Sequence, residues 1–157
     1  MNNKVLFICI HNSARSQIAE ALLKKYAGDK FQVESGGFEP RSINPYVIKV
    51  LQEEEEIDIS NNSADSLFEM LKQGKLFNYI ITVCDEGNAQ KCPIFPGMSH
   101  RIHWSFSDPS TFKGSDAEIY EQVKEVYKDI KKEVLTFIEL VINNEIKENA
   151  PAHWIQK

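Results

Sequence analysis

The sequence has few cysteines, no long apolar run and no excess of basic residues. Its three cysteines are an odd number, which does not suit a framework of static disulfides. The longest apolar stretch near the N-terminus, residues 5–10, is too short to span a membrane, and no small-residue cleavage site follows it. The net charge of −5 argues against a nucleic-acid partner. We therefore expect a cytoplasmic protein with no membrane or nucleic-acid partner, whose thiols are structural, metal-binding or reactive.

The length of 157 residues suits one domain with a sizeable core. Short β-branched and aromatic runs alternate with amphipathic helical patterns, which predicts an α/β fold with a parallel sheet covered on both faces. We expect strands at 5–8, 31–35, 79–83 and 102–106, and helices at about 13–27, from 45 onward, at 63–71 and at 116–144. The domain is expected to cover residues 1–142, and residues 143–157 form a C-terminal tail without a clear period.

The first predicted strand runs into Cys9, and Arg15 follows after five intervening residues at the start of a predicted helix. Backbone N–H groups in such a loop point inward, and the helix N-terminus adds the positive end of its dipole, so a tetrahedral anion fits there. Arg15 can bind two oxygens of the anion, and the same donors stabilise a Cys9 thiolate. Asn12 tolerates left-handed backbone angles, and Ser16 can donate a hydrogen bond to the Cys9 sulfur.

The predicted anion loop can also be interpreted without function. Cys9 would then be a buried strand residue and Arg15 a surface helix residue, because their spacing alone is a weak signal. The strand before the loop and the helix after it favour the anion site. The residues expected to bind the anion are Ile10, His11, Asn12, Ser13, Ala14 and Arg15.

Residues 5–20, VLFICIHNSARSQIAE, resemble the phosphate-binding loop of the low-molecular-weight protein tyrosine phosphatases. They resemble still more closely that of the thioredoxin-coupled arsenate reductases built on the same fold. The resemblance extends through residues 57–60, 82–84, 92–93 and 103–109, and covers about residues 4–141. It implies a single α/β domain with a four-stranded parallel sheet, thioredoxin as the reductant and no tightly bound cofactor.

The other two cysteines favour a redox reaction over hydrolysis. Cys84 follows a predicted buried strand, and Cys92 lies in the predicted long loop after it. A phosphatase needs neither thiol, whereas arsenate reduction takes two electrons from thiols. The resemblance implies that Cys9 attacks arsenate, that Cys84 then attacks Cys9, and that Cys92 takes over the disulfide for thioredoxin to reduce. Asp108, followed by proline, is the expected general acid.

The resemblance further implies a potassium ion near the anion loop. Asn12, Glu20, Ser35 and Asp65 match the residue types involved, all of which offer the oxygen donors that a hard cation prefers. Glu20 on an exposed helix face and Asp65 at a helix start are the alternative interpretations.

Departures from the family pattern bear on the choice of reaction. The interval between Cys84 and Cys92 is one residue longer than in many relatives, and Ala14 stands where some relatives have a cysteine. The alternative function is a low-molecular-weight tyrosine phosphatase, with a cysteine-phosphate intermediate and an Asp general acid. Such phosphatases usually have a proline and an aromatic residue where this chain has Gln17 and Ser110, which favours the reductase.

Two non-hydrolytic alternatives stay open. A zinc-binding module would use Cys84, Cys92, His100 and His103, but the spacing between them differs from the usual zinc patterns. A non-catalytic anion sensor that signals through thiol oxidation would use the same loop and show no turnover.

Overall fold

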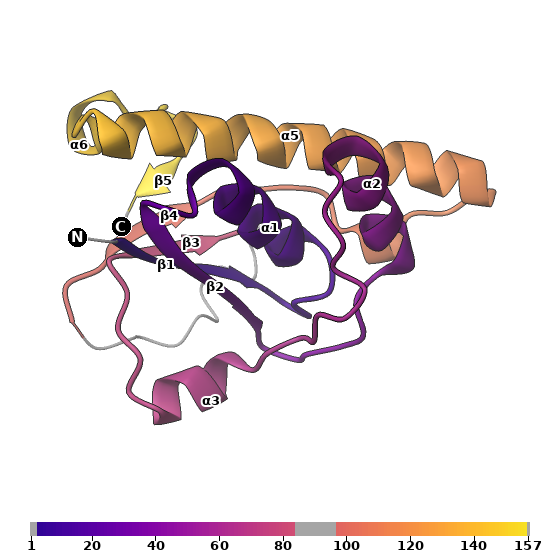
Figure 1. The fold of residues 1–157 in the computed structure, drawn as a ribbon, viewed down its shortest axis with the longest axis horizontal. Coiled ribbons are helices and arrows are strands. Elements are labelled where there is room, and N and C mark those ends of the chain that lie inside the picture. The colour runs from indigo at the N-terminus through magenta and orange to yellow at the C-terminus, as the bar shows by residue number, and fades with distance from the viewer. Residues whose placement is uncertain (1–2, 84–96, 157) are drawn as a thin grey trace.

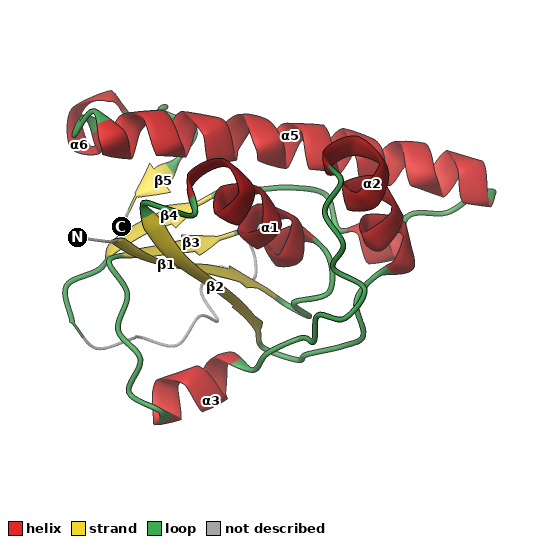
Figure 2. Ribbon diagram, in the orientation of Figure 1, coloured by secondary structure: helices red, strands yellow, loops and turns green. Residues whose placement is uncertain are grey.

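Figure 1 traces the chain in the computed structural model, which describes residues 3–83 and 97–156. The elements in chain order are β1 (Asn3–Cys9), α1 (Arg15–Ala27), β2 (Phe31–Gly37), α2 (Pro45–Glu55), α3 (Leu67–Lys72), β3 (Tyr79–Thr82), β4 (His100–His103), a 3-10 turn η1 (Pro109–Thr111), α5 (Asp116–Ile142), α6 (Ile146–Asn149) and β5 (Ile155–Gln156). Figure 2 shows that helices separate the first three strands: α1 lies between β1 and β2, and α2 and α3 lie between β2 and β3.

Four parallel strands form the sheet in the order β2-β1-β3-β4, which confirms the predicted four-stranded parallel sheet. The central strand β1 pairs with β2 so that Cys9 lies opposite Gly37, at the carboxyl edge of the sheet. In open parallel sheets ligands bind at this edge, where loops leave the strands. The tail adds β5 to β4 in the antiparallel direction.

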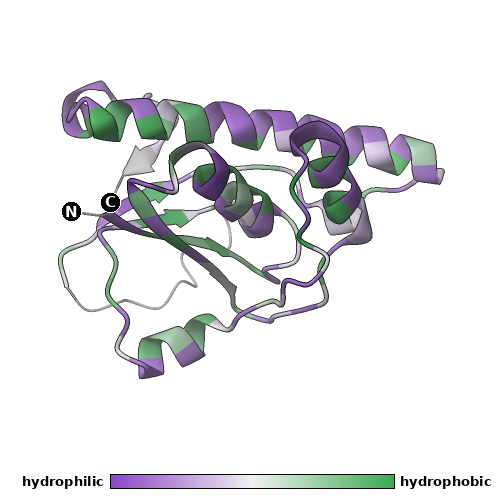
Figure 3. Cartoon of the chain, viewed as in Figure 1, coloured by the Kyte–Doolittle hydropathy of each residue, from purple (hydrophilic) through white to green (hydrophobic). Residues whose placement is uncertain are grey.

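The sheet is covered on both faces. Figure 1 shows α1, α2 and α5 on one side of it and α3 on the other. Alternate residues of β1 serve the two faces: Phe7 and Cys9 belong to the larger core under α1 and α5, while Leu6 and Ile8 belong to the smaller core over α3. This explains why residues 5–9 of β1 are all apolar, while the strand begins with the polar residues Asn3 and Lys4 (Figure 3).

A buried carboxylate ties together the three helices on the larger side. Glu55, at the end of α2, accepts hydrogen bonds from Tyr26 of α1 and from Tyr127 and Lys131 of α5. Burial alone would raise the pKa of Glu55, but Lys131, Tyr127, Tyr26 and Lys25 together lower it to about 2. The group is therefore ionised at neutral pH, and it fixes α1, which carries Arg15, against its neighbours.

Two elements have a boundary that lies three or more residues from the predicted one, and the other boundaries differ by two residues or fewer. Helix α3 begins at Leu67 rather than at residue 63, because the preceding backbone is bonded to the anion loop and to β2. Strand β4 ends at His103 rather than at 106, because its pairing with β3 ends there and the chain crosses toward Arg15. Within residues 3–83 and 97–156, no helix is long and apolar enough to cross a membrane.

The C-terminal tail docks on the edge of the sheet. Trp154 is buried, and its ring centroid lies 5.3 Å from that of Trp104 in the larger core. Its indole N–H donates to Glu133 of α5, which His153 also contacts at 3.0 Å. The apolar contact and the buried hydrogen bond hold the tail in place, while the division of the chain at residue 142 stays a prediction.

Candidate active site

The loop between β1 and α1 is held so that its amides face inward. Three amides of the neighbouring segment donate to loop carbonyls, Glu39 to Ile10 at 2.8 Å, Arg41 to His11 at 3.0 Å and Asn44 to Ser13 at 2.9 Å. Because a carbonyl and the next N–H of a trans peptide point in opposite directions, the N–H groups that follow these carbonyls turn to the inside of the loop. The Asn12 amide does so, donating to the Cys9 Sγ at 3.1 Å.

The Cys9 thiol lies at the base of this loop. It is buried at the end of β1, and its Sγ is 2.8 Å from the Oγ of Ser16 on the first turn of α1. The Ser16 Oγ accepts a hydrogen bond from Asn12 Nδ2 at 2.7 Å, so its own proton is free to point at the sulfur. Two donors and the start of a helix therefore stabilise negative charge on Cys9.

Asn12 organises the loop through all four hydrogen bonds that an amide side chain can make. It is fully buried and has a φ of 49°, in the left-handed region that asparagine tolerates. Its Nδ2 donates to Ser16 and, at 2.8 Å, to Ser35, while its Oδ1 accepts from the Asp65 amide at 2.9 Å and from Gln17 Nε2 at 3.1 Å. These four hydrogen bonds offset the energetic cost of the left-handed backbone angle and hold the loop in one conformation.

Two further residues support the loop, and neither was predicted to belong to the site. Gln17 is buried, and its Nε2 also bonds the carbonyls of Asn12 and Ser63. Gly37, at the end of β2, lies directly against the loop, since a Cβ there would meet the Asn12 nitrogen at 2.7 Å. The signal for Gly37 is the glycine pair that ends the predicted strand; Gln17 gives no comparable signal.

We expect Gly37→Ala to weaken oxyanion binding by about tenfold or more, because the new methyl group must displace backbone atoms that position the amides. Gly36→Ala is the matched control, since a Cβ at Gly36 meets only the side chains of Leu67 and Met70. Calorimetric titration with phosphate measures the effect in both variants. Equal affinities for the two would show that the loop tolerates the displacement.

The guanidinium of Arg15 faces the loop that follows β4. The Arg15 side chain is 3% exposed, and its Nη1 donates to the carbonyl of Phe106 at 3.0 Å. Its Nη2 lies 3.7 Å from Oδ2 of Asp108, whose side chain is 17% exposed. The structure therefore brings together Arg15 and Asp108, which are far apart in sequence.

The Asp108 carboxylate is held in its ionised form. Burial would raise its pKa, but the amide and hydroxyl of Ser110, the charge of Arg15 and the nearby His11 side chain lower it below its ordinary value. At neutral pH Asp108 is consequently a carboxylate. A bound dianion would take over Arg15 and raise the pKa of Asp108, which favours the acid form only when substrate is present.

The residues proposed for zinc binding do not form a site in the described part of the chain. The two ring nitrogens of His103 face Thr82 Oγ1 at 2.6 Å and Ser105 Oγ at 3.0 Å. Cys84 and Cys92 lie outside the described residues. Within residues 3–83 and 97–156, no group of three or more histidine, cysteine or acidic side chains is placed to hold a metal.

The oxygen donors proposed for potassium lie together beside the loop. The Ser35 hydroxyl donates to Glu20, and the Glu20 carboxylate is among the charges that act on Asp65. Burial and then Glu20 raise the pKa of Asp65, so a cation between these carboxylates would relieve their repulsion. Lys24, whose Nζ lies 2.6 Å from Oε2 of Glu20, already supplies part of the positive charge that offsets these carboxylates. Glu20, Ser35 and Asp65 are the oxygen donors available to a cation here, whereas the Asn12 Oδ1 already accepts two hydrogen bonds.

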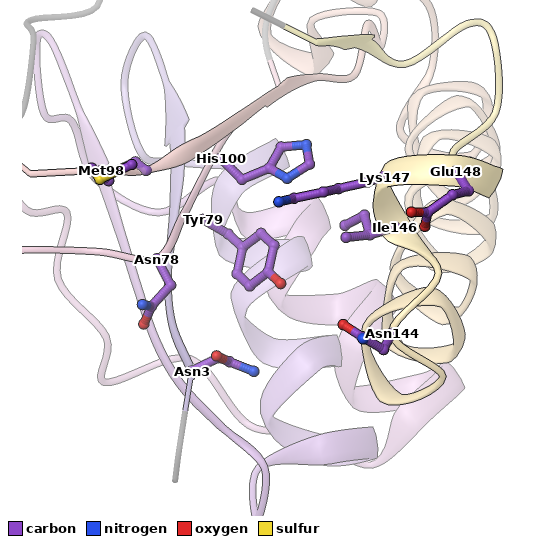
Figure 4. Close-up of a pocket in the computed structure, with 10 residues that line it drawn as sticks. Asn3, Asn78, Tyr79, Met98, His100, Asn144, Ile146, Lys147 and Glu148 are labelled. Carbon is purple, nitrogen blue, oxygen red and sulfur yellow. The ribbon is translucent and has the colours of Figure 1, made fainter.

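A polar pocket opens elsewhere, at the amino end of the sheet. Figure 4 shows Tyr79 and His100, the first residues of β3 and β4, facing Asn144 and Lys147 of the C-terminal region. Among the residues that the structure describes, its lining contains neither a thiol nor an arginine. The Cys9 thiol and the loop that follows it lie at the opposite, carboxyl edge of the sheet.

Comparison with known proteins agrees with this geometry. The model of the family described as low molecular weight phosphotyrosine protein phosphatase matches residues 4–151. The arsenate reductase of Halalkalibacterium halodurans is 39% identical over 140 residues, which cover 88% of this chain and 98% of that protein.

Solved structures are similar over the same range. An arsenate reductase in its phosphate-binding state is 25% identical with a TM-score of 0.64, covering 88% of this chain and 98% of that one. A thioredoxin-dependent arsenate reductase of Corynebacterium glutamicum is 32% identical with a TM-score of 0.56, covering 86% of this chain and 63% of that one.

Proposed function

This chain belongs to the low molecular weight phosphotyrosine protein phosphatase family, and on that premise we propose that it reduces arsenate to arsenite with thioredoxin as the electron donor. The observation that carries the proposal is the Cys9 thiol at the base of a loop whose Asn12 amide donates to its sulfur and which ends at Arg15, in a chain that matches an arsenate reductase over 88% of its length. The same loop suits phosphate, which a structurally similar arsenate reductase binds.

The first step is attack of the Cys9 thiolate on arsenic. The loop amides and Arg15 hold the arsenate oxygens and stabilise the charge that builds up on them. An S–As bond forms, an As–O bond breaks, and the departing oxygen leaves as water after it receives a proton. Asp108 is positioned to supply this proton once the anion has displaced it from Arg15.

The next steps transfer two electrons. Cys84 attacks the Cys9 sulfur, so an S–S bond forms, the S–As bond breaks, and its electron pair reduces arsenic to arsenite. Cys92 then attacks Cys84, which releases the Cys9 thiolate, and thioredoxin reduces the Cys84–Cys92 disulfide. Both thiols lie outside the described residues, so the relay rests on their places in the sequence.

A potassium ion is a further element of the proposal. Glu20, Ser35 and Asp65 would hold it, and its charge would stabilise the hydrogen-bonded network that leads through Ser35 to Asn12. We expect higher thermal stability in potassium than in sodium buffer of equal ionic strength, and no such difference in an Asp65→Asn variant. Equal melting temperatures for the wild type in the two salts would show that potassium does not bind at this site.

The test of function is arsenate-dependent NADPH consumption by the purified protein with thioredoxin and thioredoxin reductase, with hydrolysis of an aryl phosphate measured alongside. Sustained consumption is the expected result. Hydrolysis that depends on Cys9, Arg15 and Asp108 without any NADPH consumption would instead establish the phosphatase, for which the same loop and Asp108 would suffice.

A further inference from the structure

The C-terminal tail ends on the strand that leads toward the active site. Strand β5 pairs with the end of β4, with Ile155 opposite His103 (Figure 1). Trp154, directly before β5, is buried, and its indole N–H donates to the Glu133 carboxylate of α5. The match to the family model ends at residue 151, so Trp154 and β5 lie beyond it. The tail is thereby anchored both to the edge of the sheet and to the long helix.

Trp154 packs directly on Trp104, the residue that follows β4. Their ring centroids are 5.3 Å apart, and the ring planes cross at 54°. Trp104 is 2% exposed, and among the residues that the structure describes no group accepts a hydrogen bond from its indole N–H. Its ring is therefore held by packing alone, against Trp154 and, at 5.9 and 6.2 Å, against Phe7 and Phe137. Removal of Trp154 would leave a space into which the Trp104 ring can turn.

The segment that begins at Trp104 runs on to the arginine of the anion loop. The Trp104 ring meets that of Phe106 edge to face, with centroids 6.4 Å apart and planes at 77°. The Phe106 carbonyl accepts a hydrogen bond from Arg15 Nη1 at 3.0 Å, and Asp108 Oδ2 lies 3.7 Å from Arg15 Nη2. Residues 104–108 therefore contact two nitrogens of the guanidinium, and the docked tail holds the first residue of this segment in place.

We propose that Trp154 is a positioning residue for oxyanion binding, which acts through Trp104 and Phe106 to hold the Arg15 guanidinium in the orientation that the anion requires. Arginine binds an oxyanion through a planar fork of two N–H groups, so a rotation of that plane loses at least one hydrogen bond. The inference deepens the proposed function and rests on it only in so far as the anion is arsenate. Binding of inorganic phosphate tests it without any redox step.

Loss of Trp154 should impair only one part of the anion site. The carbonyls of the anion loop are bonded to the amides of Glu39, Arg41 and Asn44, which belong to a different segment from the tail and from β4. The loop amides therefore stay in place when the tail is loosened, and the contribution of Arg15 alone is reduced. Displacements of about 1 Å caused by distant substitutions are enough to weaken such interactions severely. The expected result is a partial loss of affinity rather than its abolition.

The experiment measures phosphate affinity by calorimetric titration, and the melting temperature, in the full-length wild type and in Trp154→Ala. We expect about tenfold weaker binding in Trp154→Ala, and binding within about twofold of the wild type in Trp154→Phe, which keeps a ring against Trp104. Ile146→Ala is the matched control, because Ile146 is also buried in the C-terminal region but lines the pocket at the amino end of the sheet. It should lower the melting temperature and leave the affinity unchanged. An unchanged affinity in Trp154→Ala overturns the proposal, as does an equal loss in Ile146→Ala.

Fluorine NMR gives a second readout in the unsubstituted chain, which stands even where Trp154→Ala does not fold. The chain has two tryptophans, so 5-fluorotryptophan labelling yields two signals, which Trp154→Phe assigns. Because coupling between two sites is reciprocal, saturation with phosphate should shift the Trp154 signal, and a signal that does not respond overturns the proposal. Weaker phosphate binding in Trp154→Ala together with no arsenate-dependent NADPH consumption by the wild type would overturn the proposed function and leave the positioning role of Trp154 standing.

Discussion

Cys9→Ser is expected to abolish arsenate-dependent NADPH consumption, with a loss of about 10⁴-fold or more. Serine keeps the size of the side chain, but a hydroxyl at this position is far harder to ionise than a thiol and cannot form a disulfide. The donors that face the sulfur, the Asn12 amide and the Ser16 hydroxyl, are arranged for a thiolate. The coupled assay with thioredoxin and thioredoxin reductase measures the loss.

The control for Cys9→Ser is oxyanion binding. The variant retains the inward-facing amides and Arg15, so phosphate should bind with an affinity within a few-fold of that of the wild type. Gly37→Ala is the converse variant: it keeps the Cys9 thiol but should bind phosphate more weakly, because its loop is displaced. Turnover by Cys9→Ser at more than a hundredth of the wild-type rate would show that another group attacks arsenate.

Cys92→Ser should separate the first turnover from all later ones. Cys9 and Cys84 suffice to reduce one arsenate, because they supply two electrons and form one disulfide. Without Cys92 the disulfide stays on Cys9, which is the last residue of β1 and is 2% exposed. We therefore expect one arsenite per protein molecule in a burst, followed by steady-state consumption reduced at least about a hundredfold.

Cys84→Ser is the matched variant for this experiment. It should yield no arsenite even in the first turnover, because no thiol is then placed to attack the Cys9 adduct. Mass spectrometry of the unreduced protein after one turnover should find a Cys9–Cys84 disulfide in Cys92→Ser. Many turnovers of Cys92→Ser with thioredoxin as the only reductant would refute the relay.

Much of the architecture follows from local patterns. The apolar run that ends at Cys9 is buried on both faces of a central strand, as its composition predicts, and the long amphipathic pattern after Ser115 is α5. Ser115 caps this helix together with Glu118, which explains its sharp start. The strand-loop-helix context of Cys9 and Arg15 predicted the anion loop for the same reason, since the donors lie within one short segment.

The residues that hold the anion loop from outside could not be predicted from such local patterns. Gln17 and Gly37 hold the loop through contacts with residues that are distant in sequence or that no periodicity marks. The early part of the predicted helix at 63–71 is instead extended, because the Asp65 amide is bonded to Asn12 across 53 residues. Propensity cannot reveal a segment whose backbone hydrogen bonds are taken by another part of the chain.

The sequence by itself determined the order of most strands and helices and marked the loop between Cys9 and Arg15, because short-range periodicity and spacing encode them. Only the tertiary structure decided which partners these groups meet. The parallel pairing of β1 and β2 sets Gly37 against the anion loop, and the turn after β4 brings Asp108 and Ser110 to Arg15. Such contacts join residues tens of positions apart, and they arise from the packing of whole elements rather than from any local preference.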